Sequence, residues 1–139
     1  MQRRLGESGS MWGEVVFTKV DDRSFRYDES GYVYFDHTSR HYKASKSQLY
    51  TYDQEKLLIH TYDPASYKKG TLLHTLDLSA CKANQRPICL TSEYICKEDV
   101  YQLDWILVNP NKLQLNYIVK GPSKSYTIQT TLLKKIRNE

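Results

Sequence analysis

The sequence lacks any long hydrophobic run. No window of the 139 residues approaches the roughly eighteen apolar residues that a membrane-spanning helix needs. The N-terminal hydrophobic segment that directs secretion is also missing. The three cysteines, Cys81, Cys89 and Cys96, form no close C-x-x-C pair and have no paired histidines nearby, as a structural zinc site requires. We therefore expect a protein of the reducing cytoplasm, with no membrane partner and no bound metal.

A concentration of charge of one sign is also missing. The chain has 20 Lys and Arg residues against 16 Asp and Glu residues, and the net charge of +4 is spread along it. Proteins that bind nucleic acid more often carry a dense basic stripe with aromatic residues placed to stack on bases. The short basic clusters are more typical of solvated faces, so we expect no nucleic-acid partner.

The sequence has none of the common catalytic signatures. It contains no Gly-x-Ser-x-Gly elbow, no phosphate-binding glycine loop, no His-Glu-x-x-His segment and no paired-carboxylate spacing. These absences weaken hydrolase, kinase and metalloprotease interpretations, and nothing in the sequence indicates a cofactor.

Helical periodicity is absent as well, and an alternating pattern takes its place. No apolar set at helical spacing lasts three turns, whereas turn signals recur about every eight to twelve residues. Twelve tyrosines, a residue enriched in strands, strengthen this pattern. We predict a single all-β domain over residues 11–139, preceded by a flexible lead over residues 1–10.

The clearest alternation lies between Lys112 and Leu133. It predicts two strands joined by a turn at residues 121–124, where Gly and Pro interrupt the pattern. One face of this hairpin is expected to point inward, and it carries Leu113, Leu115, Tyr117 and Val119, then Tyr126, Ile128, Thr130 and Leu132.

Further strands are expected upstream of this hairpin. Residues 29–31, Glu-Ser-Gly, predict a turn between two short strands, and residues 40–45 and 48–52 predict two more. About eight to ten strands joined by short connections favour a closed antiparallel up-and-down β-barrel, because closure removes exposed edges. A β-sandwich is the alternative. A barrel of this size can hold a small ligand.

Two segments carry a resemblance to a known family. Residues 96–101 read C-x-x-D-x-Y, and residues 119–126 read V-x-G-P-x-K-x-Y. With these motifs the chain resembles a family of small, single-domain proteins of unknown function, over roughly residues 13–135. Tyr94 stands where members of that family often have a histidine. The resemblance implies a lipocalin-like, or calycin-like, barrel and no assigned activity.

If the predicted inward face is correct, five polar-tipped side chains meet near one cavity: Tyr27, His74, Tyr101, Tyr117 and Tyr126. Such a lining suits an apolar or aromatic ligand with a few hydrogen-bonding groups, although each of these side chains could equally be a satisfied core residue. Asp99 and Lys124 sit beside turns and have a structural explanation first. The functional alternative is a polar mouth formed by Arg26, Asp99 and Lys124.

Three hypotheses about function follow. The leading one is a cytoplasmic protein that binds a small apolar or aromatic molecule inside the barrel. The second is an enzyme on the same barrel, of lyase, isomerase or decarboxylase type, with His74 or Asp99 as acid or base. The third is a protein-interaction module whose exposed patch comprises Tyr32, Tyr34, Tyr50 and Tyr52.

Overall fold

The computed structural model describes residues 7–36, 40–82, 85–122 and 125–135 of the chain. This part of the chain consists of strands and turns, without a helix, so the all-β prediction is confirmed. The strands are β1 (Glu7–Lys19), β2 (Ser24–Phe35), β3 (His41–Asp53), β4 (Lys56–Asp63), β5 (Lys68–Asp77), β6 (Ile88–Cys96), β7 (Asp99–Asn109), β8 (Lys112–Lys120) and β9 (Ser125–Lys134).

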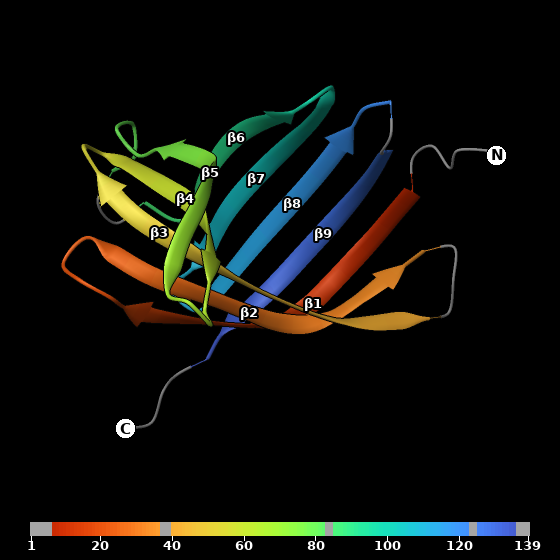
Figure 1. Ribbon diagram of the computed structural model, residues 1–139, viewed down its shortest axis with the longest axis horizontal. Coiled ribbons are helices and arrows are strands. Elements are labelled where there is room, and N and C mark those ends of the chain that lie inside the picture. Colours follow the sequence, from red (N-terminus) through yellow and green to blue (C-terminus); the bar gives the residue numbers. More distant parts are fainter. Residues whose placement is uncertain (1–6, 37–39, 83–84, 123–124, 136–139) are drawn as a thin grey trace.

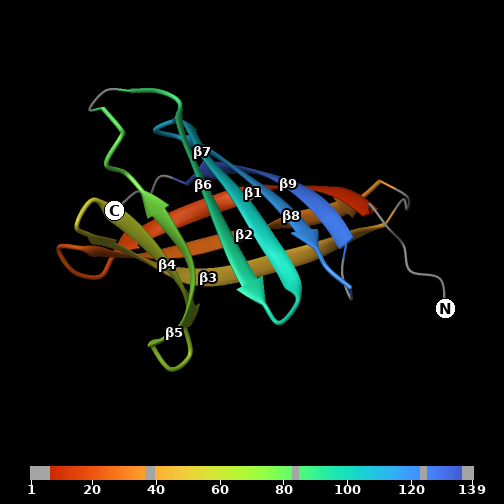
Figure 2. The same cartoon turned by 90° about the horizontal axis from the view of Figure 1, so that it is seen from above.

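All nine strands belong to one sheet, in the order β5-β4-β3-β2-β1-β9-β8-β7-β6. The sheet curls so that its two ends, β5 and β6, lie side by side and nearly close a barrel (Figures 1 and 2). The predicted barrel is therefore confirmed over the sandwich. The paired strands that follow one another in the chain are antiparallel, whereas β1 and β9 are parallel. "Up-and-down" is thus an approximate description, because strands that alternate in direction leave the first and the ninth pointing the same way.

The C-terminal hairpin forms as predicted. Strands β8 and β9 pair with Tyr117 opposite Ile128 and Leu113 opposite Leu132. Leu113, Leu115, Val119 and Leu132 are buried, which confirms the inward face. The reason is the period of two: once one residue of a strand faces the core, every second residue must do so.

The predicted turn at residues 29–31 is wrong, because β2 runs straight through it. Gly31 lies opposite Gly13 of β1, and a Cβ atom on either glycine would overlap the main chain of the other strand. The glycines therefore serve a close approach of two strands rather than a turn. Residues 40–45 and 48–52, predicted as separate strands, likewise merge into the single strand β3.

The first strand begins earlier than the predicted start of the domain at residue 11. Residues 7–10, which we had assigned to the flexible lead, are part of β1. They pair with β9 on one side, and Gly9 and Ser10 also pair with β2 on the other. The sheet ladder thus begins before the alternation of apolar residues that signals it.

The core fills only one half of the barrel. Tyr27 and Tyr50 stack with ring centroids 5.0 Å apart, and the Trp105 indole donates a hydrogen bond to the Tyr50 hydroxyl at 3.3 Å. Leucine and isoleucine side chains complete this half: Ile59, Leu76, Leu90, Leu103, Leu113, Leu115 and Leu132. Farther along the same strands, the inward side chains leave two cavities between them.

Candidate functional site

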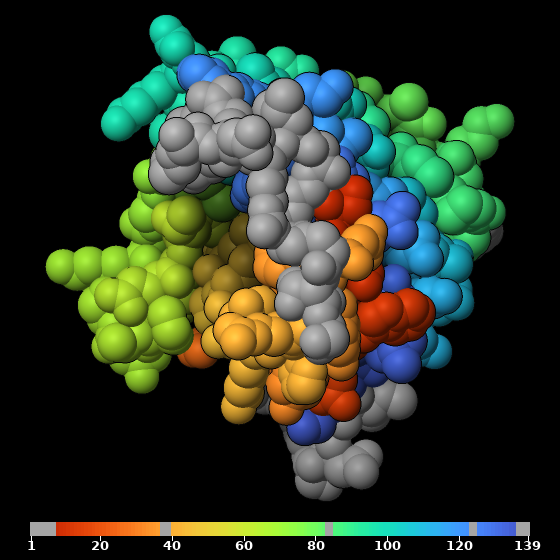
Figure 3. Space-filling model, turned by 90° about the vertical axis from the view of Figure 1, so that its right-hand side faces the viewer, coloured from red at the N-terminus to blue at the C-terminus, as the bar shows by residue number. Residues whose placement is uncertain are grey.

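Two cavities occupy the other half of the barrel. The first, of about 330 Å³, lies between strands β1–β3 and strands β7–β9, and we call it the β9 compartment. The second, of about 390 Å³, reaches the seam between β5 and β6, and we call it the seam compartment. Lys46, Tyr101 and Tyr117 line both, so the two compartments are adjacent, and we call them together the chamber. Figure 3 shows the surface hollowed beside the yellow-green atoms of the β4–β5 end.

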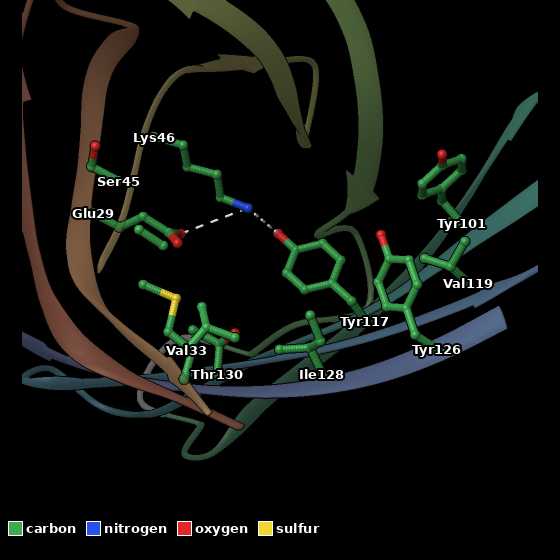
Figure 4. Close-up of a pocket in the computed structure, with 12 residues that line it drawn as sticks. Glu29, Val33, Ser45, Lys46, Tyr101, Tyr117, Val119, Tyr126, Ile128 and Thr130 are labelled. Atoms are coloured by element: carbon green, nitrogen blue, oxygen red, sulfur yellow. Dashed lines mark hydrogen bonds and ion pairs between the residues drawn. The ribbon is translucent and has the colours of Figure 1, made fainter. Parts of the chain in front are cut away.

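The walls of the β9 compartment are mainly apolar. Met11, Val33, Val119 and Ile128 supply aliphatic surface from four strands. Three tyrosines rise among them from β7, β8 and β9, with their hydroxyls toward the open space (Figure 4): Tyr101, Tyr117 and Tyr126. This combination offers hydrophobic contact over most of a ligand and a few polar points that can orient it.

An ion pair between two neighbouring strands forms part of the chamber wall. Glu29 of β2 and Lys46 of β3 are directly opposite in the sheet register, and the Lys46 Nζ atom lies 3.7 Å from a Glu29 carboxylate oxygen. The Tyr27 hydroxyl donates a short hydrogen bond to the same oxygen. Lys46 Nζ also donates to the Tyr117 hydroxyl at 3.1 Å, as Figure 4 shows. A buried carboxylate is thereby held by a phenol and an ammonium group.

The protonation states follow from these neighbours. Burial raises the pKa values of Tyr27 and Tyr50 well above the usual value for a phenol. Burial alone would lower the pKa of Lys46, but Tyr117 and Glu29 outweigh it and the pKa is raised. At neutral pH these two tyrosines are therefore neutral and Lys46 is a cation.

The seam compartment contains His74. This side chain is 5% exposed, and its Nδ1 atom lies 3.0 Å from the Ser92 hydroxyl oxygen. His74 belongs to β5 and Ser92 to β6, so their hydrogen bond crosses the seam, where the sheet ladder has its two free ends. Burial, and then the nearby charge of Lys46, lower the pKa of His74 to about 4. The imidazole is neutral at physiological pH.

The structure brings together four of the five predicted cavity residues. Tyr101 and Tyr117 line both compartments, Tyr126 lines the β9 compartment and His74 lines the seam compartment. Tyr27 is fully buried beneath the chamber and reaches it only through its hydrogen bond to Glu29.

Two residues of the predicted polar mouth, Arg26 and Asp99, lie in the described part of the chain. Arg26 alternates with the inward Tyr27 and forms an ion pair with Asp28 at 2.8 Å, with its guanidinium over the Tyr62 ring. Asp99, at the start of β7, is buried against Gly121, where a Cβ atom would overlap the Asp99 carboxylate. Lys124 lies outside the described residues.

The four-tyrosine patch of the interaction hypothesis is wrong in one member. Tyr32, Tyr34 and Tyr52 are exposed, whereas Tyr50 is buried in the aromatic core. The period of two could not have separated Tyr50 from Tyr52, because both are in phase with Gln48, and Tyr52 is exposed because it lies near the end of β3.

Sequence analysis missed the Glu29–Lys46 pair. Glu29 falls two residues after Tyr27, and Lys46 two residues before Gln48, so both positions were in phase with inward residues. Opposite charges at inward positions of neighbouring strands are the signal that could have found them. Pairing β2 with β3 in the correct register required the turn at residues 29–31 to be rejected first.

The described parts of the chain hold no cluster of three His, Cys, Asp or Glu side chains that could bind an ion. The same residues contain no helix long and apolar enough to cross a membrane. His74 contacts a serine, and the charge that most affects its pKa is the cation Lys46 rather than a carboxylate.

Comparison with known families gives one match, which covers residues 1–134: DUF6314, described as a family of unknown function. The chain belongs to this family. Membership in a family of unknown function was predicted, and it is confirmed at that level. Both motif segments, residues 96–101 and 119–126, lie within the DUF6314 match. No curated protein and no solved structure matches the chain.

Proposed function

We propose that this DUF6314 protein binds a small apolar or aromatic molecule in the chamber. The observation that carries the proposal is the contrast within one barrel. One half is filled by large side chains, whereas the other half holds two adjacent cavities of about 330 and 390 Å³. Cavities of this size lie within the range of small-ligand sites.

The lining supports the same proposal. Apolar side chains that line an open cavity gain free energy when an apolar ligand covers them and displaces water. Val33, Val119 and Ile128 offer such a surface to a ligand. The Tyr101 and Tyr126 side chains then sit where they can select among ligands of similar shape.

We also propose that the barrel is of the lipocalin-like type and acts in the cytoplasm. Binding inside a curled antiparallel sheet is the mode of lipocalin-like carriers. Free thiols at Cys81, Cys89 and Cys96 are compatible with a reducing compartment.

Native mass spectrometry of the protein purified from its own host tests the proposal. We expect a bound species of small mass at one copy per chain, which denaturation releases for identification. The matched variants are Val33→Trp, which fills the β9 compartment, and Tyr34→Trp, which adds bulk to the outer face of the same strand. Val33→Trp should lose the bound species and Tyr34→Trp should keep it. Full occupancy in Val33→Trp would contradict the proposal.

A further inference from the structure

The two charges in the chamber differ in what they present to a ligand. The Glu29 side chain is 5% exposed, and its oxygen already accepts the Tyr27 hydroxyl. The Lys46 side chain is 37% exposed and lines both compartments. Glu29 also lines the β9 compartment, but its carboxylate is far less exposed than the Lys46 ammonium, so the more accessible charge for a ligand is positive.

Lys46 also keeps unused hydrogen-bonding capacity. An ammonium group has three N–H donors. Among the residues that the structure describes, the Tyr117 hydroxyl takes one at 3.1 Å, and the nearest Glu29 oxygen, at 3.7 Å, lies beyond hydrogen-bond length. The remaining donors lie at the junction of the two compartments, next to aliphatic and aromatic surface.

We propose that the ligand is an organic acid whose apolar or aromatic body fills the β9 compartment and whose anionic group binds Lys46. This inference rests on the proposed binding function and adds the class of ligand. A carboxylate or sulfonate at this position forms charge-assisted hydrogen bonds in an environment with little competing water. The Tyr117 ring, with Lys46 Nζ 4.6 Å from its centroid, holds the ammonium in place for the anion.

The chemistry of Lys46 agrees with this role. The raised pKa keeps the amine protonated, so it can hold an anion but is a poor nucleophile toward carbonyl compounds. A cationic ligand would place two positive charges side by side, which disfavours its binding.

Two fluorescent probes that share one apolar body test the inference. Anilinonaphthalene sulfonate carries an acid group, and phenylnaphthylamine is the neutral molecule without it. In the parent protein we expect both to bind, because both fit the apolar walls. In Lys46→Met the dissociation constant of the sulfonate should rise at least about tenfold, since a hydrogen bond to a charged group is lost, whereas that of the amine should change far less.

Three further variants make the test specific. Lys43→Met removes a cation from the same strand at an exposed position outside the chamber, and should leave both dissociation constants unchanged. Glu29→Gln removes the competitor for Lys46 and should tighten sulfonate binding. Lys46→Met/Glu29→Gln avoids an uncompensated buried carboxylate, so weak sulfonate binding in this variant cannot be ascribed to unfolding.

The outcomes separate the inference from the proposed function. If the two probes weaken equally in Lys46→Met/Glu29→Gln, or neither weakens, the organic-acid inference is wrong while the binding chamber stands. If Val33→Trp displaces neither probe, or the parent binds neither, the chamber is not a binding site and the proposed function fails first.

Discussion

At the scale of single residues, the chamber depends on a chain of polar contacts between side chains that the alternation alone places inside. Three strands supply the four side chains of this chain of contacts. The Tyr27 phenol contacts the Glu29 carboxylate, which pairs with the Lys46 ammonium, and the ammonium in turn contacts the Tyr117 phenol. The inward position of Tyr117 could be predicted from its neighbours Leu115 and Val119. Its contact with Lys46 could not, because it joins residues 71 positions apart through the curl of the sheet.

The Tyr27 hydroxyl should contribute measurably to stability. Tyr27→Phe keeps the stack on Tyr50 but leaves the buried Glu29 oxygen without its phenol donor. We expect the free energy of unfolding to fall by about 1 to 3 kcal/mol in a urea titration. Tyr32→Phe, on the exposed outer face of the same strand, is the control and should stay close to the parent. An equal effect of both substitutions would show that the buried hydrogen bond is not the cause.

At the scale of the strands, the most informative error is the turn predicted at residues 29–31. A local rule interprets Glu-Ser-Gly as a chain reversal, because glycine is common in turns. The structure uses Gly31 for a different purpose, since Gly13 lies across from it and the strands approach too closely for side chains. No local pattern identifies that partner, which lies 18 residues earlier and becomes a neighbour only after the hairpin forms.

Gly31→Val should therefore be strongly destabilising. The added side chain overlaps the Trp12 carbonyl oxygen, so β1 and β2 must separate. We expect a loss of about 1 to 3 kcal/mol or more, typical of overpacking. Ser30→Val introduces the same side chain one residue earlier at an exposed site and is the control. Similar unfolding midpoints for the two variants in thermal denaturation would refute the close-approach explanation.

The β5–β6 seam should make the fold sensitive to acid. His74 has a pKa of about 4 in the folded protein, against 6.5 for an unperturbed histidine. Between these values the unfolded chain binds a proton that the folded one does not, so stability is complete above pH 6.5 and falls as the pH drops toward 4. The loss amounts to up to about 3 kcal/mol.

Urea titrations across this pH range, on the parent and on His74→Gln, measure the effect. Burial and the charge of Lys69 also lower the pKa of His60, which adds a loss of the same sign. The difference between the two proteins therefore isolates His74, and the variant should show the shallower slope. Identical slopes would mean that His74 is protonated in the folded state as readily as in the unfolded one.

At the scale of the whole molecule, the alternation of apolar residues was enough to predict an all-β barrel, because a sheet with one apolar face must curl around it or stack on another. The strand order was not predictable in this way. It depends on which strand edges meet after the hairpins have formed. Here β1 and β9 pair through backbone hydrogen bonds, whereas β5 and β6 lie in contact without such pairing. Whether the interior is filled or hollow was not predictable either, because it depends on how the inward side chains of different strands pack together along the barrel.

Hydrogen exchange should reveal this unequal closure. The outer edges of β5 and β6 have no ladder partner, whereas β1 and β9 are paired on both sides. We expect amides of β5 and β6 to exchange faster than those of β1 and β9 at neutral pH, because local opening there breaks fewer hydrogen bonds. Uniform protection across the sheet would show instead that the seam is closed as firmly as the ladder.

The parallel pairing of β1 with β9 has a consequence for synthesis of the chain. Strands β1–β5 form one continuous antiparallel ladder and β6–β9 another, and the β1–β9 pair alone joins them through the backbone. The joining strand is the last of the nine to leave the ribosome. Until it emerges, the first ladder displays an unpaired β1 edge and an uncovered apolar face, the surfaces on which aggregation and chaperone binding act. Assembly of the barrel, and with it the chamber, is therefore a late event.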